Sequence, residues 1–301
     1  MNDMLFSMQS QDGPSSSAIA GLERIDITAG EPVIEAAGGT HPGRIRDRNE
    51  DAFEVDEALG LAVIADGLGG HAAGHVASKT AVREVRMHLR ASGLSSPRRQ
   101  DRPAAPAPAT AHLAEAVQQA NKTICAMSRE IPAFSGMKTT IAAVLWARRS
   151  VLLAHVGDSR IYRLRAGKLE KLTEDHSLAA EYLRVRGEAA DLEVARQAAS
   201  QLTRCLGKSP EVRVSTHVES YQPGDAYLLC TDGLWGLVEE EAMTQAILGA
   251  SDLAHAVERL IDLANELAGS DNITAVLVRS AQDEGGNPAF DAPSPGACLR
   301  W

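Results

Sequence analysis

The chain has 301 residues, of which 44% are hydrophobic and 23% are charged, and its formal net charge is −10. These proportions are typical of a globular protein with enough residues for a full core. An acidic chain without a basic block is poorly suited to binding nucleic acid regardless of sequence, so we expect no nucleic-acid partner. No apolar run approaches the roughly 18 residues of a membrane helix, so we expect no membrane partner either.

The cysteines and the first residues indicate the compartment. The four cysteines are far apart and form no C-x-x-C pair, so neither a zinc site nor a disulfide framework is indicated. The N-terminal stretch lacks the basic start and the apolar region of a signal peptide. We therefore expect the chain to work in the reducing environment of the cytoplasm.

Composition divides the chain into one domain with a tail at each end. Residues 1–30 are polar and rich in small residues, and residues 281–301 are rich in glycine and proline, so both are predicted to be disordered. The proline- and alanine-rich stretch 94–110 is typical of a surface linker between two helices. We therefore expect one folded domain over residues 31–280.

The first half of this domain predicts two strand hairpins with two helices between them. The helices follow from apolar residues at helical spacing, and the strands from short apolar runs bounded by turn residues. In chain order these elements are the strands 51–57 and 60–66, the helices 75–92 and 111–130, and the strands 139–147 and 150–158.

The second half continues with strands joined by short turns and with long helices. In chain order it predicts a hairpin over 160–172 that turns at Ala166–Gly167, a helix over 177–200, strands over 212–220 and 225–232, helices over 239–249 and 251–269, and a strand over 272–280. Short connections favour antiparallel sheets, and paired helices can cover their outer faces. The pattern therefore predicts an α+β fold.

Acidic residues recur at the ends of the predicted strands. In "VIADG" and "LLCTDG" an apolar run ends on Asp66 and on Asp232, each followed by glycine. A glycine lets the backbone bend and lets its own carbonyl approach a ligand. The acidic residues at predicted strand ends are Glu50, Asp51, Asp66, Asp158, Asp232 and Asp271.

If these carboxylates converge, they form a strongly negative site that needs cations. Oxygen-only ligands favour Mg²⁺ or Mn²⁺ over zinc, and two such ions about 4 Å apart are typical of hydrolytic sites. Arg46 lies four residues before Glu50, and a guanidinium beside such ions is suited to clamp a phosphoryl group. A single Asp-Gly pair is usually only a turn, but the joint occurrence in this order indicates hydrolysis of a phosphate ester.

Seven motifs resemble those of the metal-dependent serine/threonine protein phosphatases of type 2C, in their bacterial form. They lie between about Gly39 and Arg279: "RDRNEDAF", "VIADGLGGHAAGHVAS", "GMKTTIAAVL", "AHVGDSRIYRLRAGKLEKLTEDHSL", "QLTRCLG", "LLCTDGLWGLV" and "SDNITAVLV". The resemblance implies a four-layer α-β-β-α sandwich, in which two central antiparallel β-sheets are flanked by helix pairs. It also implies that residues 31–280 are the catalytic domain and that the segment of about 177–205 forms a flap.

The resemblance also implies roles for the acidic residues. Asp66 is expected to bridge two Mg²⁺ or Mn²⁺ ions, with the carbonyl of Gly67 on one of them. The remaining metal-site residues implied by the resemblance are Asp232 and Asp271 on the second ion, Glu50 and Asp51 nearby, directly or through water, and Asp158 at a third, weaker ion.

The implied reaction is the hydrolysis of phosphoserine and phosphothreonine in proteins. A water that bridges the two ions attacks phosphorus in line, without a covalent intermediate, while Arg46 binds the phosphate. The resemblance does not identify the general acid, because Leu68 stands where some family members have a histidine. His71 is one candidate, a metal-bound water is another, and a third interpretation is that His71 and His75 only begin a helix.

Other interpretations of the sequence are weaker. A phosphatase of the haloacid-dehalogenase type needs an acid two residues after its aspartate, where Leu68 and Leu234 stand, and no cysteine is followed by the arginine that a cysteine phosphatase needs. A catalytically inactive phosphopeptide-binding module would have lost its metal ligands. By resemblance, the partners are phosphorylated proteins that a serine/threonine kinase has modified. We expect a monomer, because no heptad pattern is present.

Overall fold

A computed structural model describes residues 34–68, 73–92, 106–147 and 150–280. The two predicted tails and most of the predicted linker 94–110 lie outside the described residues. The same holds for His71 and for the turn at 148–149.

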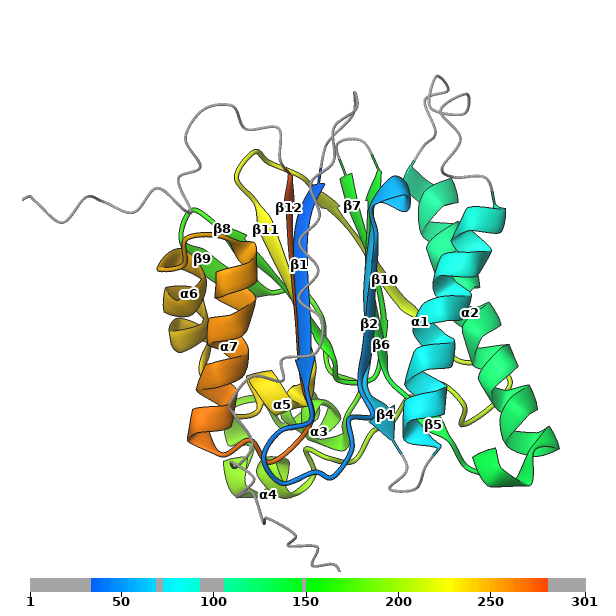
Figure 1. Ribbon diagram of the computed structural model, residues 1–301. Coiled ribbons are helices and arrows are strands. Elements are labelled where there is room, and N and C mark those ends of the chain that lie inside the picture. Colours follow the sequence, from blue (N-terminus) through cyan, green and yellow to red (C-terminus); the bar gives the residue numbers. More distant parts are fainter. Residues whose placement is uncertain (1–33, 69–72, 93–105, 148–149, 281–301) are drawn as a thin grey trace, which may run out of the picture.

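Two antiparallel five-stranded sheets form the centre of the fold (Figure 1). The first sheet has the order β1-β12-β11-β8-β9. Its strands are β1 (Ile34–His41), β8 (Arg160–Arg165), β9 (Lys168–Lys171), β11 (Ala226–Cys230) and β12 (Ile273–Ser280). The second sheet has the order β10-β7-β6-β3-β2. Its strands are β2 (Ala52–Asp56), β3 (Leu61–Ala65), β6 (Ile141–Ala147), β7 (Ser150–Val156) and β10 (Ser215–Ser220). A short pair, β4 (Gly67–Leu68) with β5 (Lys138–Thr139), lies beside it.

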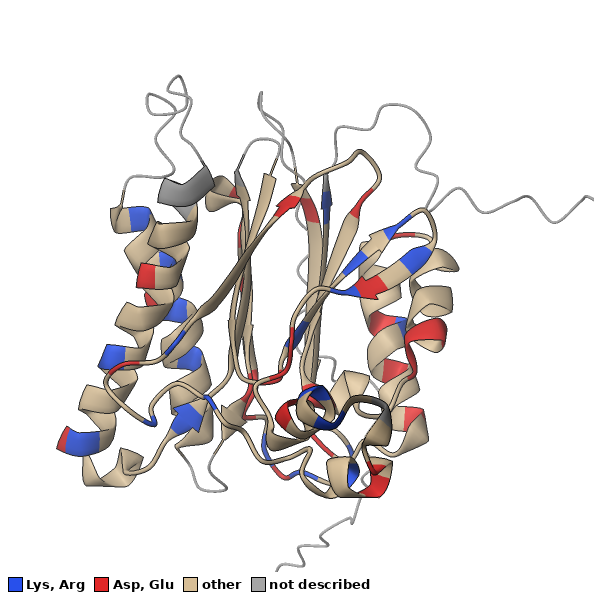
Figure 2. Ribbon diagram, turned by 180° about the vertical axis from the view of Figure 1, so that it is seen from behind, with Lys and Arg blue, Asp and Glu red and all other residues tan. Residues whose placement is uncertain are grey.

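Helix pairs cover both outer faces, so the fold has four layers (Figure 1). On the second sheet lie α1 (Gly74–Ala91) and α2 (Pro106–Glu130), and on the first lie α6 (Glu240–Leu248) and α7 (Leu253–Leu267). Lys and Arg predominate on α1 and balance Asp and Glu on α2, whereas Asp and Glu predominate on α6 and α7 (Figure 2). The α-β-β-α sandwich expected from the sequence is therefore confirmed, and its net negative charge is unevenly distributed.

The apolar core has three parts, one between the sheets and one under each helix pair. Strand β3 shows why its sequence is a continuous apolar run. Its residues Leu61, Val63 and Ala65 face α1 and α2, while Ala62 and Ile64 face the other sheet, and all of them are fully buried. A strand buried on both faces needs apolar residues at every position.

The structure differs from the sequence-based prediction at three places. Residues 106–110, predicted to belong to the linker, are the first residues of α2. Strand β1 was not predicted, since its Gly38 and Gly39 weaken any strand signal. A Cβ on Gly38 would lie 2.5 Å from the ring of Phe53, so close packing explains the glycine. The segment 177–200, predicted to be helical, forms two helices: α3 (Leu178–Arg186) ends at Gly187, where φ is 53°, and after the short turn η4 (Gly187–Ala189) the helix α4 (Leu192–Gln197) follows. Glycine adopts positive φ without strain, so it interrupts the helix.

Two further short 3₁₀ turns and one helical turn complete the described elements. They are η1 (Glu57–Leu59), which closes the β2–β3 hairpin, η3 (Pro132–Phe134), and α5 (Asp232–Trp235). Asp232 therefore begins a helical turn directly after β11.

Candidate metal centre

The strand register brings the predicted acidic residues to one end of the sandwich (Figure 1). Ala65 at the end of β3 pairs with Ala52 at the start of β2, and Cys230 at the end of β11 pairs with Ala275 near the start of β12. Residues that follow β3, β7 and β11 therefore meet those that precede β2 and β12. We call the resulting group the carboxylate cluster: Glu50, Asp51, Asp66, Asp158, Asp232 and Asp271.

Two adjacent threonines hold the backbone of Asp66. The Asp66 amide donates to Thr140 Oγ1 at 2.9 Å, and the Asp66 carbonyl accepts from Thr140 N at 2.9 Å and from Thr139 Oγ1 at 2.7 Å. Three hydrogen bonds therefore fix the residue between β3 and β4 and leave its carboxylate to face the cluster. The sequence analysis did not assign this role to the two threonines of "GMKTT".

Asp51 is held on one side only. Its Oδ2 accepts hydrogen bonds from Thr231 Oγ1 at 2.9 Å and from Thr274 Oγ1 at 2.6 Å. Within the part of the chain that the structure describes, its Oδ1 is buried without a hydrogen-bond partner, and so is Oδ1 of Asp232. A buried polar atom without a partner is costly. These two bare oxygens fit a site in which a cation supplies the missing partner.

Burial and mutual repulsion raise the pKa values across the cluster. Burial raises the pKa of Asp66 well above its usual range, with further contributions from Asp51 and Asp232. Burial likewise raises the pKa of Asp51 to about 7 and that of Asp158 to about 7, and the charge of Asp232 adds to both. Burial also raises the pKa of Asp232, followed by the charge of Asp271. The carboxylates are therefore close enough to repel one another, as the ligands of a divalent ion must be.

The glycines at the cluster leave space that a side chain would fill. A Cβ on Gly67 would lie 2.4 Å from the carbonyl oxygen of Gly74 and 2.5 Å from that of Glu50. A Cβ on Gly74 would lie 2.4 Å from Glu50 Oε2 and 3.0 Å from the carbonyl oxygen of Gly67. The Glu50 carboxylate and the Gly67 carbonyl therefore share one small space beside the start of α1.

Among the described residues, no three His, Cys, Asp or Glu side chains already stand as a finished metal-ligand group. The fit to a divalent cation therefore rests on the bare oxygens of Asp51 and Asp232, on the oxygen-only donors and on the glycine-lined space. These are the features that Mg²⁺ and Mn²⁺ require, since both ions also keep waters and accept backbone carbonyls.

Arg46 lies at the edge of the cluster. Its Nη2 donates to Asp271 Oδ2 at 2.8 Å, and the two side chains are 53% and 37% exposed. The carboxylates of Asp232 and Asp66 are also near enough to raise the pKa of Arg46, after the larger effect of Asp271. The guanidinium of Arg46 therefore contacts the cluster directly, and it can also reach solvent.

Asn272 ties the segment that carries Arg46 and Glu50 to the start of β12. Its Oδ1 accepts from the Glu50 amide at 2.8 Å, and its Nδ2 donates to the carbonyls of Pro42 and Arg48 at 2.9 Å each. From the sequence, Asp271 of the motif "SDNITAVLV" was singled out, whereas its neighbour Asn272 was not. The motif itself was the available signal, since asparagine provides both a donor and an acceptor.

The structure thus brings together Arg46, Gly67 and all six acidic residues singled out from the sequence. His71 lies outside the described residues, so its proposed role as general acid is not tested. His75 is the second residue of α1, which agrees with the interpretation that it begins a helix.

A family model described as protein phosphatase 2C matches residues 39–272. The chain belongs to the protein phosphatase 2C family. The serine/threonine phosphatase stp of Listeria monocytogenes serotype 4b is 36% identical over 260 residues, which are 83% of this chain and 97% of that protein.

Solved structures of family members agree. The serine/threonine phosphatase PstP/Ppp of Mycobacterium tuberculosis has a TM-score of 0.72 at 33% identity, covering 82% of this chain and 99% of that one. The catalytic domain of PstP in complex with two manganese ions has a TM-score of 0.69 at 33% identity and covers 82% of this chain and 97% of that one.

Membership of the protein phosphatase 2C family confirms the fold class, the serine/threonine phosphatase activity and the Mg²⁺ or Mn²⁺ dependence that the sequence predicted. Within the part of the chain that the structure describes, every helix falls short of the length and hydropathy needed to cross a bilayer.

Proposed function

We propose that this chain removes phosphate from phosphoserine and phosphothreonine in proteins modified by a serine/threonine kinase, and that the carboxylate cluster is its metal centre. The observation that carries the proposal is the pair of buried, unpartnered oxygens on Asp51 and Asp232. They lie in a cluster whose members raise one another's pKa values.

The expected division of roles follows the position of each ligand. Asp66 and the Gly67 carbonyl would help to hold two Mg²⁺ or Mn²⁺ ions. The other residues that would hold ions are Asp232 and Asp271, with Glu50 and Asp51 acting directly or through water, and Asp158 with Asp232 for a third, weaker ion. When bound, the ions activate water and offset the charge on the phosphoryl oxygens.

The residues of the chain itself orient and bind. The guanidinium of Arg46 exchanges its contact with Asp271 for the phosphoryl oxygens, because a planar fork of donors matches them well. The backbone bonds of Thr139 and Thr140 keep the Asp66 carboxylate in place while charge changes around it. The proton for the departing alkoxide comes from His71 or from a water.

The segment 177–205 is proposed to be a flap that contributes to substrate choice. In support, α3 and α4 expose apolar side chains, with Val185 75% exposed and Leu192 69% exposed. We further propose that residues 31–280 form the catalytic domain, that the protein is a monomer and that it works in the cytoplasm. For the last point, Cys125, Cys205 and Cys230 are free thiols, which suits a reducing compartment.

Hydrolysis of a phosphothreonine peptide by the purified protein tests this function. The reaction is followed with EDTA, Mg²⁺ or Mn²⁺, for the wild type, Asp232→Asn and the control Asp262→Asn, which changes an exposed aspartate on α7. We expect activity only with added metal, a loss of at least ~100-fold in Asp232→Asn, and no change in the control. Failure of wild-type protein to hydrolyse the peptide with either metal would refute the proposal.

A further inference from the structure

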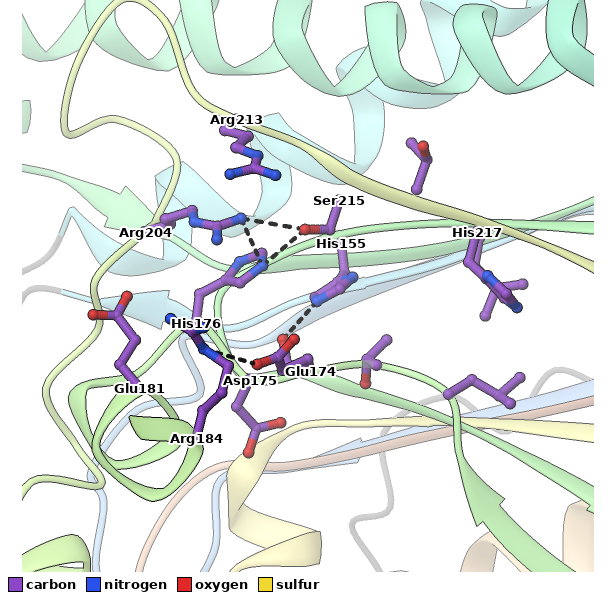
Figure 3. A pocket seen from close by; sticks show the side chains of 14 residues that line it. His155, Glu174, Asp175, His176, Glu181, Arg184, Arg204, Arg213, Ser215 and His217 are labelled. Atoms are coloured by element: carbon purple, nitrogen blue, oxygen red, sulfur yellow. Dashed lines mark hydrogen bonds and ion pairs between the residues drawn. The ribbon is translucent and has the colours of Figure 1, made fainter. Parts of the chain in front are cut away.

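A second polar site lies between the sheets and the segment around α3, and the metal centre does not use it. This pocket has a volume of about 450 Å³. Its lining includes His155 of β7, His176 of the segment between β9 and α3, and Ser215 at the start of β10. Arg204 and Arg213 also line it (Figure 3). We call it the histidine pocket.

The two histidines stack and are neutral. Their ring centroids are 4.5 Å apart with an angle of 15° between the planes. Burial lowers the pKa of His176 to about 3, and the charges of Arg204 and Arg213 contribute. Burial also lowers the pKa of His155, whose Nε2 lies 2.9 Å from the carbonyl oxygen of Glu174.

The hydrogen bonds of His176 fix which of its nitrogens carries the proton. Its Nδ1 accepts from the amide of Gly157 at 3.1 Å, so the proton of the neutral ring is on Nε2. This Nε2–H donates to Ser215 Oγ at 3.0 Å. However, Nη1 of Arg204 lies only 2.9 Å from the same Nε2 (Figure 3).

The Nε2–H of His176 and the Nη1 of Arg204 are therefore both donors, and neither can accept from the other. The Ser215 hydroxyl oxygen is the acceptor for both. Arg204 Nη1 also donates to Ser215 Oγ, at 3.2 Å. With both donors directed at its oxygen, the Ser215 hydroxyl is left to donate its own proton. The group formed by His176, Arg204 and Ser215 thus has more donors than acceptors, and this is the arrangement that an oxyanion satisfies.

The charge balance points the same way. Among the described residues, neither Arg204 nor Arg213 forms an ion pair with a carboxylate. Two of the three acidic residues that line the pocket have other partners: Arg160 binds both oxygens of Asp175, and Glu174 lies 3.9 Å from Arg184. Glu181 is exposed on α3. Besides burial, the groups that lower the pKa of His176 are the stacked His155 and the positive charges of Arg204 and Arg213.

We propose that the histidine pocket binds an oxyanion of the phosphate class, at a site separate from the carboxylate cluster. Arginine provides the planar donors that tetrahedral oxyanions prefer, and Ser215 and His176 add neutral donors. A volume of about 450 Å³ exceeds what free phosphate needs. The pocket therefore takes either free phosphate or a phosphoryl group carried by a second residue of the substrate.

The pocket is joined to the metal centre through one residue. The amide of His176 donates to the carbonyl of Gly157 at 2.9 Å, and its ring accepts from the Gly157 amide. Gly157 has a φ of 107° and directly precedes Asp158. An anion held by His176 and Arg204 therefore sits behind the turn that presents Asp158.

Binding of inorganic phosphate to the full chain in EDTA tests the proposal by isothermal titration calorimetry. Without metal, the carboxylate cluster repels anions, so only the histidine pocket is expected to bind. The variant Arg213→Gln removes an exposed charge from the pocket and should weaken binding about tenfold. The control Arg83→Gln removes an exposed charge from α1 and should leave the affinity unchanged.

A second variant, Arg204→Gln, should abolish binding, and circular dichroism checks that it folds. Wild-type protein that takes up no phosphate in EDTA, or phosphate binding unchanged in Arg213→Gln, overturns the proposal. These measurements need no phosphatase activity, so they fail or succeed independently of the proposed metal centre.

KM values measured in Mn²⁺ for peptides with one or two phosphothreonines show whether the anion in the pocket belongs to the substrate or is free phosphate. If the substrate carries the anion, Arg213→Gln raises KM only for the doubly phosphorylated peptide. If free phosphate is the ligand, the ratio of the two KM values stays the same while phosphate affinity falls. Either result supports an oxyanion site in the histidine pocket.

Discussion

Replacing Asn272 should loosen the segment that carries Arg46 and Glu50. In Asn272→Ala three hydrogen bonds are lost: those to the Glu50 amide and to the carbonyls of Pro42 and Arg48. At about 0.5–1.5 kcal/mol each, the free energy of unfolding should fall by roughly 2–4 kcal/mol. For a domain of this size, that corresponds to a drop in Tm of roughly 5–12 °C.

The positioning role of Asn272 predicts an effect beyond stability. The apparent affinity for Mn²⁺, measured from the metal dependence of hydrolysis well below Tm, should weaken about tenfold as the Glu50 backbone loses its anchor. Asn272→Asp keeps the acceptor for the Glu50 amide and loses only the two donated bonds, so its metal affinity should lie between those of Asn272→Ala and the wild type.

Asn121 provides a matched control. It is fully buried, donates to the carbonyls of Ser209 and Pro210, and accepts from the Gly207 amide. Asn121→Ala therefore loses the same kinds of bond away from the metal centre. It should be destabilised to a similar degree and keep its affinity for Mn²⁺. Equal metal affinities in Asn272→Ala and Asn121→Ala would refute the reasoning.

Three more predictions follow from contacts at the metal centre and the histidine pocket. Gly67→Ala should lower activity at least ~100-fold, because the new methyl group would lie within 2.5 Å of two carbonyl oxygens; wild-type rates in hydrolysis assays would contradict this. Thr140→Val removes the acceptor for the Asp66 amide and should reduce kcat about tenfold, whereas the exposed control Thr216→Val should match the wild type in kcat. His176 has a pKa lowered to about 3, so the folded state takes up its proton later than the unfolded state does. The stabilisation that this group provides is complete above about pH 6.5. As the pH falls towards 3, the free energy of unfolding therefore decreases by roughly 2–4 kcal/mol. Thermal unfolding of wild type and His176→Gln across this range should show a smaller decrease in the variant.

Much of the metal centre could be predicted because its ligands are marked locally. Asp66 and Asp232 each end an apolar strand and precede glycine, so the sequence around each one reveals a rigid, outward-facing carboxylate. The antiparallel register then places both at one end of the sandwich. Short turns between strands were enough to predict antiparallel sheets but not this register, since three helices separate β11 from β12.

The residues that hold these ligands were not predicted, because their role depends on contacts between distant segments. Thr274 donates to Asp51 across a separation of 223 residues, and Thr140 accepts from Asp66 across 74. A threonine in a strand is also simply a good strand former, so nothing in its local sequence marks it as a partner. Strand β1 was missed for a related reason: its glycines fit closely against Phe53 and Ile261, and that fit exists only in the folded protein.

The proposed ligands of the metal centre come from both sheets. Asp66 follows β3 of the second sheet, whereas Asp232 follows β11 and Asp271 precedes β12, both of the first. Ions held between them would act as a non-covalent cross-link that joins the two halves of the sandwich at one end. Metal at 100 times its dissociation constant would then add about 2.7 kcal/mol to the free energy of unfolding. The ions needed for hydrolysis would therefore also stabilise the contact between the two sheets. Removing them with a chelator would loosen that end of the sandwich before it changed the outer helix pairs.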